Sequence, residues 1–410
     1  MKTDHHVVIL GAGYAGMLCA LRLAHRTRRL GVRITLVNPS DRFTERIRMH
    51  QVAAGQELAD HRIADLLDGT GITFHQGRAT AIAPVTRHVT IDADHELRYD
   101  TLVYALGSAA DTSLVPGAEA HAFTLDDPRT AHRFAARLAE VAAAGGGAVA
   151  VCGGGLTGIE AAAEIAESWP GLRVTLISRD VPAAMMSDKA RGYVHRALER
   201  LGVTLRIGTE VAKVLPGMVE LGGGEFVPSD VCLWTAGVRV SALAADAGFE
   251  TDVRGLVRVD AALRSVSHPD VYAIGDAAAA RQAWGTIHGT CQSGLPTAAH
   301  VADTIARALR GEKAKPFRFG YVHQLVSLGR RDAVAQFTHA DDSPRRLHLT
   351  GRTAARYKES VSSSPVTLFR LSKHVNVTVA LSKGRHAGRG RRQVGLDAAP
   401  GSLADSGTTR

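Results

Sequence analysis

Two glycine-rich turns have the spacing that lets a main chain approach a pyrophosphate group closely. The first spans residues 11–16 (GAGYAG), and the second spans residues 153–158 (GGGLTG) with Glu160 shortly after it. Each turn follows an apolar run and precedes an alanine- and leucine-rich stretch. A strand, a glycine turn and a helix in this order offer unpaired N–H groups and a favourable dipole to a phosphate. Each pattern therefore predicts a dinucleotide site, while a tight strand–helix turn without a ligand is the alternative.

The two turns belong to an internal duplication with an offset of 142 residues. A second predicted strand follows each helix, at residues 33–37 and 173–177. Each unit then continues into short β-rich segments and ends in an apolar strand followed by glycine, at Gly107 and at Gly237. We therefore expect an α/β fold with two Rossmann-like dinucleotide-binding domains.

The residues after the second strands bear on which dinucleotide each site takes. Asn38 stands where an acidic ribose ligand is usual, and its amide can still bond a ribose hydroxyl. In the second unit the strand ends at Ser178 and Arg179, which lack the carboxylate that would repel a 2′-phosphate. NADPH use is one hypothesis from this pair, and a solvated surface Arg179 is the other.

A third signal is Gly275-Asp276 after an apolar strand, since a carboxylate there can accept bonds from ribityl or ribose hydroxyls. Beyond it, Pro296 predicts the start of a helix through residue 309. The dipole at the start of that helix, near Thr297, would stabilise a negative charge placed there. A plain turn aspartate is the alternative for Asp276.

The order of these motifs resembles the two-dinucleotide-binding flavoproteins, and most of all the type II NADH dehydrogenases, over about residues 5–337. The residues that carry the resemblance are the two glycine turns, residues 99–107 (YDTLVYALG), residues 234–238 (WTAGV) and residues 272–276 (YAIGD). The resemblance implies FAD in the first domain and NAD(P)H in the second. It implies that NAD(P)H delivers a hydride to FAD and that a quinone or quinone-like acceptor takes the electrons.

The resemblance also implies an FAD domain with an inserted NAD(P) domain, plus a small C-terminal α+β region at a dimer or membrane interface. We expect the FAD domain at residues 1–115 and 241–318, the NAD(P)H domain at 116–240, the C-terminal region at 319–382 and a disordered basic tail at 383–410. A homodimer is one consequence that this interface allows.

Candidate site residues follow from the same motifs. Glu160 is expected to fix the nicotinamide or lie near the flavin, with a dipole-stabilised helix carboxylate as the alternative. His300 and His50 are candidates for the acceptor pocket, with a packed histidine as the alternative for each. The residues expected to bind the cofactors are Gly11, Gly13, Tyr14, Ala15, Gly16, Asn38, Arg46, Ala79, Gly107, Gly153, Gly155, Gly158, Ser178, Arg179, Gly237, Gly275, Asp276, Pro296 and Thr297.

Two departures from related patterns narrow the chemistry. Residues 42–55 contain no cysteine where the disulfide reductases of the superfamily carry a redox cysteine, and they resemble the type II NADH dehydrogenases there instead. The four cysteines show no metal-finger spacing, so no metal site is expected. The Ala-Gln-x-Ala-x-Gln pattern of quinone-reducing members is replaced, since residues 299–304 read AHVADT. The electron acceptor therefore stays open between a quinone and a quinone-like compound.

Composition and charge restrict the partners. The chain of 410 residues is 45% apolar and 22% charged, and it has no apolar run near the roughly 18 residues that span a bilayer, which excludes transmembrane and disordered classes. The net charge of +9 is concentrated between residues 345 and 392, where twelve lysines and arginines face the single acid Glu359.

We expect a cytoplasmic protein. The basic C-terminal region either attaches it peripherally to the anionic inner face of the cell membrane or is solvated. Pro365 is expected to interrupt the candidate helix of this region. No nucleic-acid-binding module accompanies this region, so no nucleic-acid partner is expected. Two further functions stay open: an oxidoreductase for a soluble aromatic metabolite, and a flavoprotein resembling apoptosis-inducing factor that uses NAD(P)H as a signal.

Overall fold

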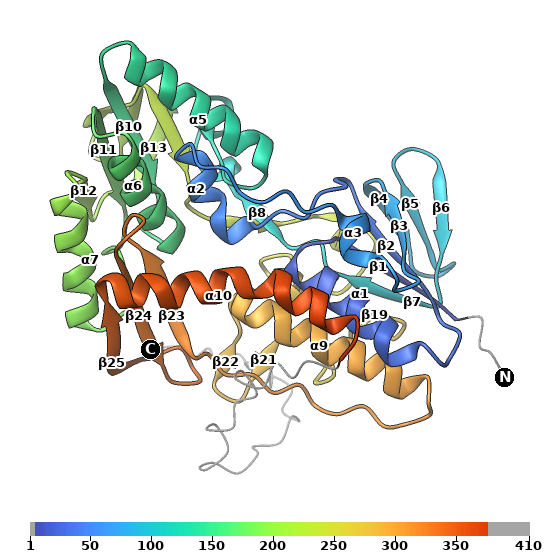
Figure 1. Ribbon diagram of the computed structural model, residues 1–410. Helices are drawn as coiled ribbons and strands as arrows, with labels where there is room; N and C mark the ends of the chain where they lie inside the picture. Colours follow the sequence, from blue (N-terminus) through green and yellow to red (C-terminus); the bar gives the residue numbers. More distant parts are fainter. Residues whose placement is uncertain (1–4, 376–410) are drawn as a thin grey trace, which may run out of the picture.

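The computed structural model describes residues 5–375, and two parallel five-stranded sheets dominate it (Figure 1). The first sheet has the order β19 (Val271–Ala273), β7 (Thr101–Tyr104), β1 (His6–Leu10), β2 (Arg33–Asn38) and β3 (Thr73–Gln76). The second has the order β12 (Thr204–Ile207), β11 (Leu172–Ser178), β10 (Gly147–Cys152), β16 (Val231–Trp234) and β9 (Ala122–Phe123). Both glycine turns follow the central strand of their sheet, as the duplication predicts, so the α/β fold of two Rossmann-like units is confirmed.

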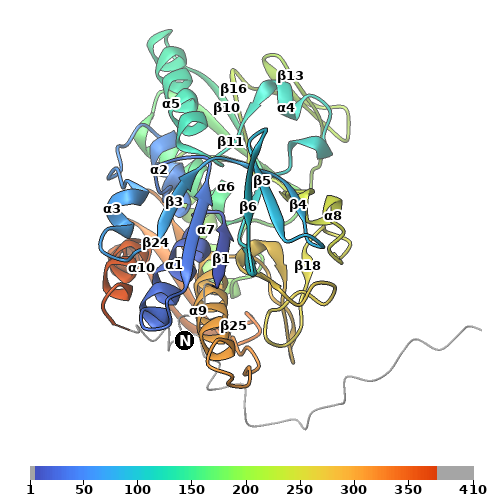
Figure 2. The same cartoon turned by 90° about the vertical axis from the view of Figure 1, so that its right-hand side faces the viewer.

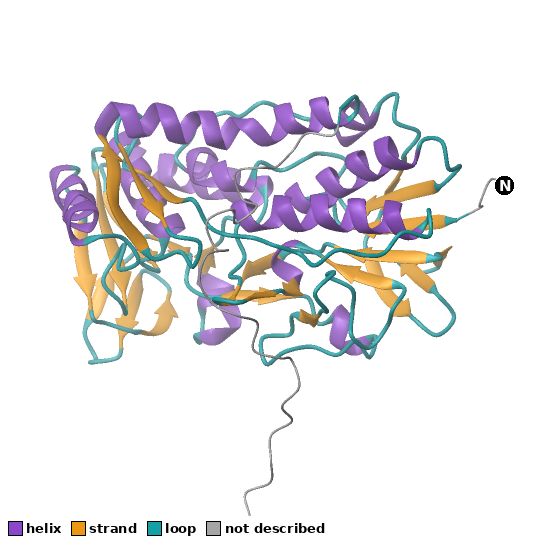
Figure 3. Ribbon diagram, turned by 90° about the horizontal axis from the view of Figure 1, so that it is seen from below, coloured by secondary structure: helices purple, strands orange, loops and turns teal. Residues whose placement is uncertain are grey.

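Helices pack on both sheets because their apolar residues recur at helical spacing. The longer helices are α1 (Tyr14–Thr27), α5 (Pro128–Ala143), α6 (Leu156–Ser168), α7 (Asp188–Arg200), α9 (Cys291–Ala308) and α10 (Gly351–Ser372). The short ones are α2 (Met49–Ala53), α3 (Ile63–Leu67), α4 (Ala118–His121) and α8 (Leu243–Asp246), with 3-10 turns η1 (Arg46–Arg48), η2 (Thr112–Leu114) and η3 (Gly275–Ala277). Figure 3 shows strands grouped at the two ends of the molecule and long helices between them.

Small sheets of two or three strands complete each unit, and one of them joins the two units. Three-stranded sheets are formed by β4 (Ala79–Ala83), β5 (His88–Ile91) and β6 (His95–Arg98), and by β13 (Val211–Leu215), β14 (Met218–Leu221) and β15 (Phe226–Pro228). The first of these stands beside β1 in Figure 2. A parallel pair forms between β18 (Val257–Arg258) and β20 (Ala278–Ala279), and an antiparallel pair forms between β21 (Arg281–Gln282) and β22 (Gly285–Thr286). The two crossings between the units are β8 (Ser108–Ala110) and β17 (Val238–Val240), which pair antiparallel.

The C-terminal region consists of a three-stranded sheet and one long helix. The strands are β23 (His323–Ser327), β24 (Ala333–Thr338) and β25 (Pro344–Thr350). Val326 and Val334 share a core with α6 of the second unit, whereas Phe369 of α10 lies in the core around α1. The helix α10 therefore extends from the C-terminal sheet to the first unit, as Figure 1 shows.

Two expectations about prolines are wrong. Pro365 was expected to interrupt the last helix, yet α10 continues through it, because the buried Val366 and Phe369 hold the following turn against the core. The helix expected to begin at Pro296 begins at Cys291 instead. Thr290 and Ser293 form a reciprocal capping box there, in which each backbone N–H donates to the other side chain, so the helix starts one and a half turns earlier.

The segment expected to be a disordered tail, 383–410, lies outside the described residues, as do 376–382 of the expected C-terminal region. Within residues 5–375, no helix combines the length and the apolar character that crossing a bilayer requires.

Replacing Phe369 with alanine should destabilise the protein by about 3–5 kcal/mol, because a large side chain would be lost from the core. Its ring is fully buried and packs edge-on against Phe43, with 5.2 Å between ring centroids. Urea unfolding followed by tryptophan fluorescence measures the change. Leu371→Ala on the same helix is the control, because Leu371 is 48% exposed and its loss should be nearly neutral. Equal effects of both substitutions would contradict the assigned packing of α10.

Candidate active site

The first glycine turn is shaped so that its outer side stays open. Gly11 has a φ of +98°, and its N–H donates to the Val37 carbonyl at 2.8 Å. A Cβ on Gly16 would overlap the Gly11 carbonyl oxygen, so α1 and β1 can pack this closely only with glycine there. A Cβ on Gly13 would meet nothing within 4 Å. The open side is therefore where a pyrophosphate fits, at the N-terminus of α1.

Asn38 holds this turn from the end of β2. Its Oδ1 accepts a hydrogen bond from the Ala12 N–H at 3.0 Å, and its Nδ2 donates to the Ser40 carbonyl at 2.8 Å. The amide that the sequence offered to a ribose is thus engaged with the main chain on both sides. In this structure Asn38 shapes the glycine turn.

The second glycine turn repeats the geometry of the first. Gly153 has a φ of +125°, a Cβ on Gly158 would overlap the Gly153 carbonyl oxygen, and Gly155 is open. Ser178 is buried at the end of β11, and its hydroxyl donates to the Asp180 carbonyl at 2.6 Å. Arg179 is beside it, 71% exposed, with carboxylate oxygens of Asp180 at 3.6 Å and Glu210 at 3.8 Å.

The Gly-Asp loop lies on α9. The Gly275 N–H donates to the Thr297 hydroxyl at 2.9 Å, and that hydroxyl donates to the Gly294 carbonyl at 2.6 Å. The Thr297 hydroxyl, in the second turn of α9, therefore links the Gly-Asp loop to the helix through two hydrogen bonds. Pro296 is buried next to it. Asp276 accepts a hydrogen bond from the Ser108 hydroxyl at 2.8 Å, which links this loop to β8.

Other predicted cofactor residues are Arg46, Gly107 and Gly237, near the strands β8 and β17 that connect the two units, and Ala79 in β4. Arg46 donates to the Ser108 carbonyl and pairs with Asp126 at 2.9 Å. Gly107 and Gly237 both have left-handed φ values, which lets each crossing strand turn out of its sheet. Ala79 begins β4 and is half-buried.

Tyr14, within the first glycine turn, carries a buried hydroxyl group. Its hydroxyl is buried and has no hydrogen-bond partner among the described residues, and burial raises its pKa far above the usual range. Buried hydroxyls are normally bonded, so an added polar group is expected there. The nearby Cys291 is half-buried, and the loss of water around its thiol raises the pKa to about 11 and keeps it protonated. The two open glycine turns, Asp276 and this orphaned hydroxyl fit FAD and NAD(P)H.

Glu160 lies buried where both units meet the C-terminal region. The Lys358 ammonium of α10 lies 2.5 Å from its carboxylate, and the Ser327 N–H of β23 donates to it at 2.9 Å. His50 of α2 completes the cluster, with Nδ1 3.7 Å from the Glu160 carboxylate and Nε2 3.4 Å from the Ser327 hydroxyl. We call these four residues the Glu160 cluster. Glu160 lies beyond the first turn of α6, so Lys358, and not the helix dipole, is its main partner.

Electrostatics fix the charges in the Glu160 cluster at neutral pH. Burial alone would raise the pKa of Glu160, but Lys358, His50 and the Ser327 N–H outweigh burial and hold it below the usual value. Burial lowers the pKa of His50 to about 4, despite the opposing Glu160 carboxylate. Glu160 is therefore an anion, and His50 is a neutral imidazole that can accept a proton only in a strongly acidic medium or from a strong acid.

His300 is placed elsewhere. It lies nine residues into α9, about 14 Å along the helix from its start. Its ring packs against Phe317, and burial lowers its pKa. The structure thus brings Glu160 and His50 together but does not bring His300 to them.

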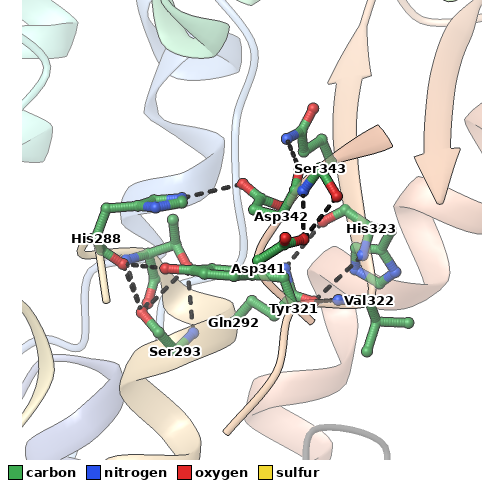
Figure 4. Close-up of polar contacts among 11 residues, drawn as sticks. His288, Gln292, Ser293, Tyr321, Val322, His323, Asp341, Asp342 and Ser343 are labelled. Carbon is green, nitrogen blue, oxygen red and sulfur yellow. Dashed lines mark hydrogen bonds and ion pairs between the residues drawn. The ribbon is translucent and has the colours of Figure 1, made fainter. Parts of the chain in front are cut away.

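A second polar cluster fixes the start of α9 against β23 (Figure 4). His288 stacks on Tyr321 with 4.4 Å between centroids, and the Tyr321 hydroxyl donates to the His288 carbonyl at 2.7 Å. His288 also lies 3.2 Å from the Asp342 carboxylate. Gln292 donates to the His323 carbonyl at 2.9 Å, so the first turn of α9 is tied to the C-terminal sheet.

Sequence reasoning missed Lys358 and Ser327. Neither lies in a glycine motif, and both reach Glu160 from more than 160 positions along the chain. The one sequence feature that could have marked Lys358 is its residue type, because the other cations of this helix are all arginines.

Comparisons with known proteins agree with this geometry. The family model described as pyridine nucleotide-disulphide oxidoreductase matches residues 5–304. An NADH dehydrogenase-like protein of Mycobacterium tuberculosis is 29% identical over 379 residues, covering 87% of this chain and 93% of the relative. A type II NADH:quinone oxidoreductase of Staphylococcus haemolyticus is 27% identical over 409 residues, covering 92% and 98%.

Among solved structures, the sulfide:quinone oxidoreductase of Aquifex aeolicus has the same fold, with a TM-score of 0.78 at 19% identity, covering 90% of this chain and 92% of that one. The family match extends over both glycine turns and the Gly-Asp loop, whose shapes fit the two cofactors. The chain belongs to the pyridine nucleotide-disulphide oxidoreductase family, whose cofactors are FAD and NAD(P)H.

Proposed function

We propose that the protein is an FAD-dependent NAD(P)H oxidoreductase that passes electrons to a quinone or quinone-like acceptor. The observation that carries the proposal is the Glu160 cluster, a buried charged site at the meeting point of two dinucleotide units. The names of the mycobacterial and staphylococcal relatives support it. The overall reaction converts NAD(P)H, a proton and a quinone into NAD(P)⁺ and a hydroquinone.

The two glycine turns hold the cofactors in this proposal. The first, with Asp276, suits FAD, and the second suits NAD(P)H. FAD supplies the chemistry of accepting a hydride from a nicotinamide and giving electrons to an acceptor. Ser178 and Arg179 keep NADPH use open, because Arg179 is exposed and held only by two exposed carboxylates.

The Glu160 cluster handles protons. A quinone takes up two protons for its two electrons, so one proton must come from solvent. Lys358 is 12% exposed and contacts Glu160, so it connects the buried carboxylate to the surface. The anionic Glu160 can take a proton and pass it on, and the neutral His50 beside it adds no competing positive charge.

Attachment to an anionic membrane surface and homodimer formation stay predictions. On the described part of the chain, Arg370 and Leu371 at the end of α10 are exposed and suit a peripheral contact.

Purified protein loaded with FAD should oxidise NADH or NADPH when menadione is supplied. Steady-state kinetics with both donors measures kcat/KM. Flavin that is reduced by NAD(P)H but is not reoxidised by any quinone would contradict the proposal and favour the signalling alternative.

Replacing Glu160 with glutamine should slow turnover with menadione about 100-fold, because a general acid–base group is lost. Stopped-flow absorbance separates reduction of the flavin by NAD(P)H from its reoxidation. Glu164→Gln is the matched control one turn along α6. Glu164 is also buried, burial raises its pKa, and it does not contact Lys358 or Ser327. An unchanged rate in the Glu160 variant would remove this carboxylate from the mechanism.

Replacing His50 with glutamine should reduce the acid sensitivity of folding. The folded-state pKa of His50 is about 4 against 6.5 unfolded, so its stabilising effect is complete above pH 6.5 and is lost as pH falls toward 4. The difference amounts to about 3 kcal/mol over that window. Urea unfolding between pH 4 and pH 7 measures it, with His132→Gln, an exposed imidazole, as control. Parallel curves for the His50 variant and the unmodified protein would show that the imidazole is not buried neutral.

A further inference from the structure

A pocket of about 270 Å³ opens beside the Glu160 cluster, between the β23–β24 turn and α10. Ser327 and Lys358 belong to both the cluster and the pocket. We call it the arginine pocket, because Arg330, Arg331, Arg352, Arg356 and Lys358 line it against only two acids, Asp332 and Glu359.

Neither acid neutralises the arginine pocket. Asp332 pairs with Arg200 of α7 at 2.7 Å, and Glu359 pairs with Arg48. Arg330 forms a long ion pair with the buried Glu164, with 3.7 Å between the arginine Nε and a carboxylate oxygen. Lys358 is already paired with the Glu160 carboxylate. The positive charge of the remaining arginines is therefore not cancelled by the pocket walls.

Three of these arginines lack a carboxylate partner within residues 5–375: Arg331, Arg352 and Arg356. Arg352 and Arg356 lie one turn apart on α10, where like charges repel. Arg352 also lies in the first turn of that helix, where the dipole disfavours a cation and favours an anion. An anion in the pocket would relieve both costs.

The lining suits an acid and does not suit an apolar tail. Among the described residues around the pocket, Ala355 is the one apolar side chain, and the others are polar, charged or glycine. The volume exceeds the ~150 Å³ cavity that holds benzene elsewhere. A small aromatic acid fits this space, whereas an isoprenoid chain would remove the arginines from water without pairing them.

We infer that the arginine pocket binds the carboxylate or phosphate group of a small, soluble electron acceptor and thereby directs it to the Glu160 cluster. This inference rests on the proposed function and specifies its substrate class: an anionic quinone-like acid. Arg331 and Arg356 line the pocket from different elements, the β23–β24 turn and α10, so an acidic group between them can accept charge-assisted hydrogen bonds from both.

Equilibrium dialysis of the oxidised holoprotein against anthraquinone-2-carboxylate tests the inference without turnover. The neutral 2-(hydroxymethyl)anthraquinone is the matched probe. We expect the acid to bind at least tenfold more tightly than the alcohol, to be displaced by inorganic phosphate, and to bind more weakly as salt rises. Equal binding of both probes would overturn the inference, and so would displacement by phosphatidylglycerol vesicles but not by phosphate.

The double variant Arg331→Gln/Arg356→Gln should weaken binding of the acid about tenfold or more and leave the alcohol unaffected, because charge-assisted hydrogen bonds are lost. Arg370→Gln is the control, since Arg370 is an exposed residue of α10 that does not line the pocket. Loss of binding in the control, or none in the double variant, would refute the site.

Turnover of menadione, which has no acidic group, separates this inference from the proposed function. If the unmodified protein reduces menadione but the arginines do not affect binding of the acid, the inference alone fails. If menadione is not reduced and the dialysis result holds, the proposed function fails while the anion site remains.

Discussion

A carboxylate buried between separate parts of the chain constrains the whole structure. Glu160 is 7% exposed and ionised, so it must be paired where it lies. Its partners come from α2, β23 and α10, which belong to regions far apart in sequence. Removing one partner of a buried pair costs about 3–5 kcal/mol because it leaves an unpaired buried charge, so these elements must meet at this point if Glu160 is to stay paired.

This constraint explains why α10 crosses the molecule as it does. At one end its lysine must reach Glu160 on the second unit, and at the other end Phe369 packs in the core of the first. Both requirements are met only by a helix that continues through Pro365. The proline was read from sequence as an interruption because local propensity disfavours it by about 3 kcal/mol, a cost that burial of the following turn offsets.

The parts that could be predicted from sequence are those fixed by short-range sterics. Strand, glycine turn and helix follow one another within some 20 residues, and the glycines at 11, 16, 153 and 158 are required by close approaches inside that span. The Glu160 cluster could not be predicted, because Ser327 and Lys358 join it through the packing of a sheet and a helix that no local motif marks. Asn38 and Thr297 were expected to contact the cofactors, and in the structure their polar groups bond the main chain.

The same packing of α10 brings part of the positive charge of the C-terminal region together at one place. The net charge of this region suggested an extended acidic partner such as a membrane surface. The sequence gives the number of charged residues but does not show which of them lie close together in space. In the structure Arg352, Arg356 and Lys358 converge with Arg330 and Arg331 on one concave site next to a buried carboxylate. A flat anionic surface cannot enter a pocket between a turn and a helix, whereas a small acid can. The position of these charges therefore argues for a soluble partner at this site, and leaves membrane contact to the cations that lie outside it.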